Sequence, residues 1–261
     1  MKIAFFLLAI AVPLTLSAKV VGKSVTYKAG DVTLKGYLAY NTSVKAKVPG
    51  IIVIHEWWGL TEYPKRRARM LAELGYVAFA ADMYGDGKTV DNPTDAGNAA
   101  GASMKDQALF KAKFMAALDY LKQDEHVDSS RIGAIGYCYG GSVVLNMADA
   151  GVDLDGVVSF HGSLGGVTPP EKGALKAKVL VCAGADDKFN PPDAIAKFKD
   201  GMKEAGADME YVAYKGAVHA FTNPEATKLG EKFKIPIAYN KKADQESWMA
   251  MKEFFKKLFP M

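Results

Sequence analysis

The sequence has few of the residues that mark metal-binding, disulfide-rich or nucleic-acid-binding proteins. Its 261 residues include only two cysteines, Cys138 and Cys182, and four scattered histidines. Their spacing does not suggest a zinc site. No dense basic run accompanies an aromatic RNA-binding signature, and the formal net charge is only +4. We therefore expect no metal and no nucleic-acid partner.

The pronounced apolar run at the N-terminus is shorter than the roughly 20 residues of a comfortable membrane span. A lysine at position 2 precedes an almost wholly apolar stretch over residues 3–16, and Ser17 and Ala18 follow. This layout predicts a signal peptide over residues 1–18, cut after Ala18 or, alternatively, after Ser17. An uncleaved anchor is the other interpretation. After cleavage we expect a periplasmic or secreted protein without a stable membrane span, in which residues 19–261 form a single domain.

Short apolar runs alternate with helical patterns along the mature chain, which predicts a mostly parallel sheet covered on both faces. We therefore expect a three-layer α/β/α sandwich that opens with an antiparallel hairpin. Residues 85–102 are polar, contain glycine and proline, and are predicted to form a loop. Strands are predicted at 51–54, 76–80, 131–136, 156–160, 178–183 and 209–214. Helices are predicted at about 63–74, 104–122, 140–149, 192–205 and 243–258.

A Gly-Tyr-Cys-Tyr-Gly-Gly turn at residues 136–141 joins a predicted strand to a predicted helix. It matches the G-x-S-x-G nucleophile elbow of the α/β-hydrolase fold, with Cys138 in place of serine. The glycines leave room for neighbouring backbone, and the start of the helix favours the thiolate. We therefore predict Cys138 as a nucleophile, although a core cysteine on a tight turn would give the same pattern. Cys182 lies within an apolar run and is predicted to be a buried, inert thiol.

A thiol nucleophile needs a base, and that base needs an orienting acid. In this fold the chain order is nucleophile, acid, histidine. Asp187 and His219 follow later strands in that order. Asp186 is the alternative acid, but Asp187 fits the usual acid loop better because a proline follows four residues later.

The strand at 51–54 is followed by a His-Glu-Trp-Trp-Gly run. Acyl transfer needs donors for a developing oxyanion, and the backbone N–H groups of Trp57 and Tyr139 occupy the expected places. We expect Glu56 to point into the same pocket, where a buried carboxylate could retain the thiol proton until substrate arrives. A helix-capping or salt-bridged acid is the alternative for Glu56.

Together these motifs resemble the dienelactone hydrolase (carboxymethylenebutenolidase) family over about residues 22–258. The matching segments lie at 55–60, 81–85, 136–141, 184–187 and 219–221. The resemblance implies a catalytic triad of Cys138, His219 and Asp187, with no metal or organic cofactor. It also implies that Glu56 pairs with the resting thiol and is displaced when substrate binds.

Two positions depart from the family pattern. The family's namesake enzymes bind a substrate carboxylate with two arginines, but this chain has Lys88 near the first position and Asn223 at the second. Lysine supplies a charge without the bidentate geometry of arginine. A dienelactone carboxylate is therefore a poor candidate substrate.

We expect a monomeric hydrolase that acts on a small ester or lactone through a thioester acyl-enzyme. Predicted substrate-binding residues are Tyr84, Trp58, His161 and Phe221; His161 has a structural hydrogen-bonding role as its alternative, and the aromatic residues could instead be core. Two other functions stay open: a thiol-based redox or thioester-handling protein, and a catalytically silent ligand-binding module.

Overall fold

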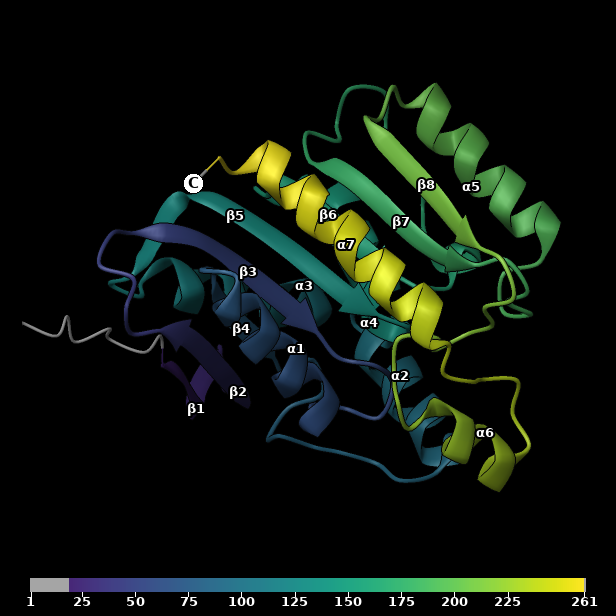
Figure 1. Cartoon of the computed structure of the whole chain (residues 1–261), viewed down its shortest axis with the longest axis horizontal. Helices are drawn as coiled ribbons and strands as arrows, with labels where there is room; N and C mark the ends of the chain where they lie inside the picture. Colours follow the sequence, from purple (N-terminus) through teal and green to yellow (C-terminus); the bar gives the residue numbers. More distant parts are fainter. Residues whose placement is uncertain (1–18, 261) are drawn as a thin grey trace, which may run out of the picture.

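A computed structural model of the chain describes residues 19–260, so the predicted signal peptide lies outside the described residues. Within them, eight strands form one open sheet with helices on both faces (Figure 1). The strands are β1 (Val20–Ala29), β2 (Val32–Asn41), β3 (Val48–Ile54), β4 (Val77–Ala81), β5 (Val127–Tyr137), β6 (Gly156–Phe160), β7 (Lys178–Gly184) and β8 (Met209–Tyr214). The helices are α1 (Glu62–Glu73), α2 (Pro93–Lys105), α3 (Gln107–Lys122), α4 (Tyr139–Asp149), α5 (Pro192–Glu204), α6 (Ala226–Phe233) and α7 (Lys241–Leu258), with a 3₁₀ turn at Leu164–Gly166.

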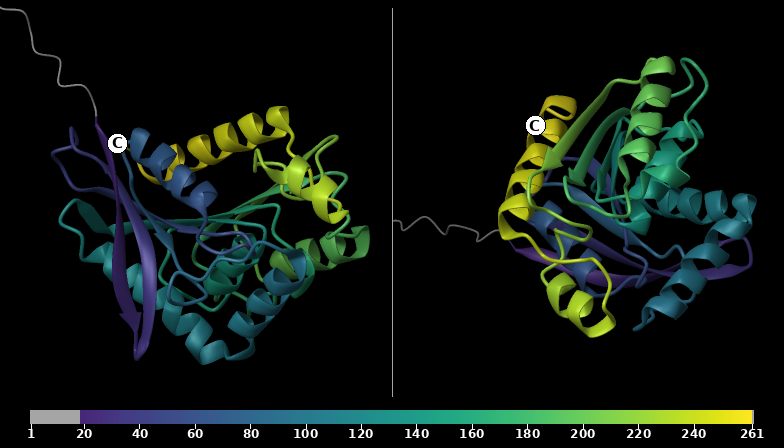
Figure 2. Two further views of the ribbon diagram at one scale, coloured as in Figure 1. Left: turned by 90° about the horizontal axis from the view of Figure 1, so that it is seen from below. Right: turned by 90° about the vertical axis from the view of Figure 1, so that its right-hand side faces the viewer.

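The strand order is β1-β2-β4-β3-β5-β6-β7-β8. In this order, every neighbouring pair from β4 through β3 to β8 is parallel. The strand β2 pairs antiparallel with both β1 and β4. The hairpin of β1 and β2, the long purple pair in the left panel of Figure 2, forms one edge of the sheet and packs against α1 and α3. These features confirm the predicted mostly parallel sandwich with an N-terminal hairpin.

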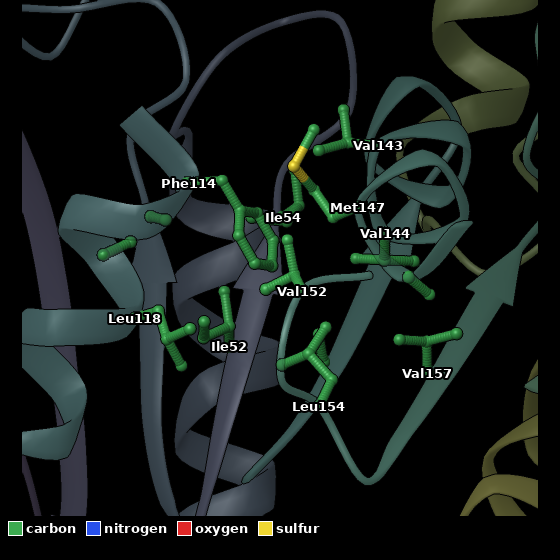
Figure 3. Close-up of a cluster of buried hydrophobic side chains, with 14 of the residues drawn as sticks. Ile52, Ile54, Phe114, Leu118, Val143, Val144, Met147, Val152, Leu154 and Val157 are labelled. Atoms are coloured by element: carbon green, nitrogen blue, oxygen red, sulfur yellow. The ribbon is translucent and has the colours of Figure 1, made fainter. Parts of the chain in front are cut away.

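Two apolar cores lie on opposite faces of the sheet because successive residues of a strand point to opposite sides. Ile52 and Ile54 of β3 belong to the core covered by α3, α4 and α5, whereas Ile51 and Val53 belong to the core under α1 and α7. Figure 3 shows the first of these cores, in which side chains of α3 and α4 meet those of β3 and β6. No helix within residues 19–260 has the length and apolarity needed to cross a membrane.

The parallel strands all end at the same edge of the sheet, and α2 and α6 lie beyond that edge (Figure 1 and Figure 2). The predicted site residues follow strand ends there: Glu56 after β3, Cys138 after β5, Asp187 after β7 and His219 after β8. Ligands of such sheets bind at the carboxyl ends of the strands, so the fold brings these residues to the expected edge.

The prediction of a loop over residues 85–102 is wrong from residue 93 onward, because α2 begins at Pro93. The Asn92 side chain accepts a hydrogen bond from the Asp95 N–H at 3.0 Å, and proline at the first helical position suits a helix start. The helix predicted over about 104–122 is α3, which begins at Gln107 because Asp106 ends α2 and caps α3 through the Leu109 N–H. The helix α6 was not predicted, since its eight residues carry no strong start signal.

We predict that Gly140→Ala destabilises the protein by about 1–3 kcal/mol, the usual cost of overpacking. A methyl group on Gly140 would overlap the backbone carbonyl of Ile54, which cannot rotate away. Gly101→Ala in α2 is the matched control, because nothing lies within 4 Å of that position. It should stabilise the protein by about 0.5–1 kcal/mol. Urea unfolding measures both changes, and equal stability of the two variants would contradict the tight elbow packing.

Candidate active site

Cys138 lies between β5 and α4 with φ 55° and ψ −115°, a backbone conformation that non-glycine residues rarely adopt. Its N–H is shared between two acceptors, the Phe160 carbonyl oxygen and Nδ1 of His161, each at 3.0 Å. The side chain is half-buried and lines a pocket. The structure therefore places the thiol on a strained turn above the sheet, as the elbow motif predicted.

His219 and Asp187 are both buried, and Nδ1 of His219 lies 2.9 Å from Oδ2 of Asp187. Asp186 is exposed, so Asp187 is the acid that meets the imidazole. Burial alone would lower the pKa of His219, but the adjacent Cys138 sulfur and the Asp187 carboxylate together raise it to about 10. The histidine thus contacts both the acid and the sulfur, and both contacts favour the protonated imidazole.

Two residues that the sequence analysis missed fix the Asp187 carboxylate. Its Oδ1 accepts from the Phe189 N–H at 2.8 Å, and Oδ2 accepts from Nδ2 of Asn190 at 3.1 Å. Asn190 also donates to the Gly162 carbonyl at 2.9 Å and is buried. The Phe189 ring lies over His219, with ring centroids 4.6 Å apart. The sequence gives one signal for Asn190, which is its place directly before the two prolines at the start of α5.

Glu56 is buried in the same pocket, and its Oε2 accepts from Nδ2 of Asn223 at 2.6 Å. Burial raises the pKa of Glu56 to about 7, although Asn223, His219 and Arg67 partly oppose this rise. Within residues 19–260 this amide is the hydrogen-bond partner of the Glu56 side chain. The structure therefore shows a Glu56–Asn223 pair where the family resemblance implied a Glu56–thiol pair.

The segment that carries Glu56 is fixed by His55 and Asp82, which are both buried. Nε2 of His55 accepts from the Met83 N–H at 3.2 Å, so Nδ1 carries the proton and donates to the Glu56 carbonyl at 2.6 Å. Asp82 accepts hydrogen bonds from four backbone N–H groups, those of Lys35, Tyr84, Gly85 and Gly87. These bonds fix the loop after β4 against the loop after β3.

The pocket has a volume of about 280 Å³ and is mostly apolar. Trp57 and Tyr139, the predicted oxyanion-hole residues, line it beside Cys138 and Trp58. The N–H of Tyr139 has no acceptor within the helix, because Tyr139 is the first residue of α4. Further wall residues are Ala100, Met104, Ser142, Asn146, Ser163, Gly166, Phe189, Ala220 and Ile237. The helix α2 supplies Ala100 and Met104 to this wall, whereas a loop was predicted up to residue 102.

Tyr84, His161 and Phe221 do not line this pocket, although they were predicted to bind substrate. Tyr84 donates from its hydroxyl to the Trp57 carbonyl at 2.8 Å and so supports the wall from behind. Phe221 is fully buried in the core under α1 and α7. His161 is fully buried too, and both of its ring nitrogens bind protein groups.

His161 belongs to a buried polar network that reaches α1 and α7. Because Nδ1 accepts from Cys138, Nε2 donates to Oγ1 of Thr222 at 2.7 Å. That hydroxyl lies 2.6 Å from the Tyr63 hydroxyl, which accepts from Nε of Arg67 at 3.2 Å. Burial, with His219 and Arg67 nearby, keeps the pKa of His161 well below its ordinary value. The ring is therefore neutral, as an acceptor for the Cys138 N–H must be.

The sequence model of the dienelactone hydrolase family matches residues 34–259. The protein usf of Aquifex pyrophilus is 32% identical over 242 residues, which cover 90% of this chain and 98% of that protein. The crystal structure of a dienelactone hydrolase-like promiscuous phosphotriesterase from metagenomic libraries is 33% identical, with a TM-score of 0.85 over 93% of this chain and all of its own. An esterase of Thermogutta terrifontis shares the fold, with a TM-score of 0.62 at 19% identity over 90% of this chain and 92% of its own. The chain belongs to the dienelactone hydrolase family and is a hydrolase of esters or lactones.

Proposed function

We propose that the chain hydrolyses its ester or lactone through a Cys138–His219–Asp187 triad and a thioester acyl-enzyme. The observation that supports this most directly is the buried contact of His219 with Asp187, next to a thiol on a strained elbow. The three groups come from three different strand ends, and a purely structural role would not require all of them to meet in one apolar pocket.

In the proposed reaction the Cys138 thiolate attacks the carbonyl carbon, and the N–H groups of Trp57 and Tyr139 stabilise the resulting oxyanion. Collapse of this intermediate breaks the carbon–oxygen bond to the alcohol, which takes its proton from the His219 imidazolium. The neutral imidazole then removes a proton from water, and the hydroxide attacks the thioester. Release of the carboxylic acid regenerates the thiolate and the imidazolium, while Asp187 orients the ring throughout.

The structure offers little support for a disulfide-exchanging protein. The other cysteine of the sequence, Cys182, is fully buried in β7, and burial raises its pKa to about 12. Such a thiol is neither accessible nor ionised at neutral pH. Cys138 therefore has no resolving partner within this chain.

We predict that Cys138→Ala lowers kcat/KM for a 4-nitrophenyl ester by roughly 10⁴-fold or more, because the covalent route is lost. Intact-protein mass spectrometry during turnover of the unaltered enzyme should show a gain of one acyl group on Cys138. The control is Cys182→Ala, which removes the other thiol and should keep the acyl adduct.

Turnover by Cys138→Ala at the rate of the unaltered enzyme would contradict the nucleophile assignment. If the unaltered protein neither hydrolyses any of a panel of esters and lactones nor accepts an acyl label, it is a ligand-binding module on the same fold.

We also predict that His161 positions the nucleophile without touching substrate. In His161→Leu the Cys138 N–H and Thr222 lose a buried partner, a cost of about 1–3 kcal/mol each. The kcat should therefore fall by roughly 10- to 100-fold while KM stays nearly constant. His161→Asn, which restores an acceptor, should recover part of the kcat. A change in KM alone would instead indicate that His161 contacts substrate.

We propose that residues 1–18 direct export and that the mature enzyme acts in the periplasm or outside the cell. In a bacterial host, N-terminal sequencing of the periplasmic protein should begin at Lys19, or at Ala18 for the alternative cut. Leu8→Arg should leave full-length protein in the cytoplasm, because it interrupts the apolar run. Lys28→Glu, an exposed change in β1, is the control. Export of both variants alike would disprove the signal peptide.

A further inference from the structure

The pocket around Cys138 contains no lysine or arginine among its described wall residues. Its ionisable groups are Glu56, Cys138, Tyr139 and His219. Lys88, the cation that the sequence placed near this region, is exposed and lines a different hollow with Thr89 and Asp91. Among the described wall residues, the pocket therefore presents no cation other than the His219 imidazolium, which pairs with the Cys138 thiolate in the proposed mechanism.

The two buried lysine or arginine side chains of residues 19–260, Arg67 and Lys113, are already bound to other groups. Arg67 forms an ion pair with Asp244 and donates to the Thr222 carbonyl at 2.7 Å. Lys113 donates to the carbonyls of Met83 and Tyr84 at 3.2 and 3.0 Å. Neither side chain lines the pocket, so neither is available to bind a substrate carboxylate.

Asn223 determines how the Glu56 carboxyl sits in this pocket. Its Oδ1 accepts from the Glu225 N–H at 3.0 Å, which fixes the orientation of the amide. Nδ2 must then face Glu56, and it donates to Oε2 at 2.6 Å. An amide donates a hydrogen bond but adds no charge, so the Glu56 carboxylate is anchored without being neutralised. Asn223 is itself buried, so water does not screen the pair.

We propose that the Glu56–Asn223 pair makes this pocket selective for uncharged esters and lactones and excludes substrates that carry a carboxylate. The proposal rests on the hydrolase function argued above and names its substrate class. A substrate carboxylate would enter next to an anchored negative group, with no cation to bind it, and like charges in a desolvated site repel strongly. Asn223 is thus a specificity-determining residue, which acts through the charge it leaves on Glu56.

The rest of the wall suits an uncharged, apolar substituent. Met104 and Phe189 are 36% and 41% exposed and are two of the three large hydrophobic side chains exposed among residues 19–260. Both line the pocket, together with Trp57 and Trp58. Exposed apolar side chains that gather at a pocket usually contact a ligand, so we expect the acyl or alcohol chain of the substrate to bury them.

The experiment compares two esters of the same length, 4-nitrophenyl pentanoate and mono-4-nitrophenyl glutarate, which differ in a terminal methyl or carboxylate group. At about pH 8.5 we expect kcat/KM for the pentanoate to exceed that for the glutarate by roughly 100-fold, the range expected for repulsion in a desolvated site. A ratio within about threefold would overturn the proposal.

The ratio of kcat/KM for the pentanoate to kcat/KM for the glutarate should also depend on pH. Because the pKa of Glu56 is raised to about 7, its carboxyl is mostly neutral at about pH 6, where the glutarate carboxylate is still ionised. The groups that face Glu56 are Asn223, His219, and Arg67 and Tyr63 of α1. Arg67 stays charged, and burial raises the pKa of Tyr63, so neither titrates in this interval. We expect the ratio to fall roughly tenfold at the lower pH.

Two variants test which group carries the charge. Glu56→Gln keeps the size and the hydrogen bond but removes the charge, so the ratio should fall to its low-pH value and lose its pH dependence. Asn223→Arg supplies the missing cation and should lower the ratio by roughly tenfold or more. Lys88→Gln is the matched control, and its ratio should equal that of the unaltered enzyme.

These outcomes distinguish failure of the proposed charge selectivity from failure of the proposed triad. An unchanged ratio in Glu56→Gln, or loss of glutarate turnover in Lys88→Gln, would overturn the charge selectivity even if all turnover depends on Cys138. Turnover of the pentanoate without Cys138 would instead overturn the triad. Because the ratio compares two substrates on one enzyme preparation, a partly unfolded variant does not change its value.

Discussion

Cys138 has φ 55° and ψ −115°, and a side-chain-bearing residue persists in such a conformation only where its surroundings fix it. Here the turn packs so closely that side chains at Gly136 or Gly140 would overlap backbone atoms. The Cys138 N–H also bridges two acceptors of the next strand end, Phe160 and His161. Because β5 and β6 are adjacent parallel strands, the sheet itself fixes the thiol's position. The other groups of the site are arranged around that point.

Hydrogen bonds link this turn to distant helices. Thr222 contacts His161 through its hydroxyl, while its carbonyl accepts from Arg67 of α1, which pairs with Asp244 of α7. His219 lies three residues before Thr222 in the same loop, so one network positions both His219 and the turn that carries Cys138. A buried ion pair contributes little net stability on average. Its effect here is that it joins α1 to α7 and holds Arg67 where it donates to the Thr222 carbonyl.

The sequence predicted what depends on local pattern and on chain order. The buried parallel strands, the elbow and the order of Cys138, Asp187 and His219 follow from apolar runs, glycine spacing and strand ends. The structure brings these three residues together, and it also selects Asp187 over Asp186 through burial. Predictions failed where the outcome depends on tertiary contacts. The helix α2 has only Ala96 and Ala99 buried, so its sequence reads as polar loop, and yet it forms a wall of the pocket.

The direction of a side chain was the least predictable property, because residues at one strand end can face the pocket, the core or each other. His161 and Glu56 both follow strands at this edge of the sheet, yet His161 binds the backbone N–H of Cys138 and Glu56 binds the Asn223 amide. A buried carboxyl with a single neutral donor is costly to ionise, and residue 223 decides whether that cost is offset by a cation or only by a hydrogen bond. In the proposed mechanism the Cys138 thiolate and the His219 imidazolium neutralise each other, so with asparagine at 223 the remaining charge is that of Glu56 above its pKa of about 7. On this proposal the electrostatics of the pocket are set by residue 223, which lies outside the proposed triad and need not touch substrate.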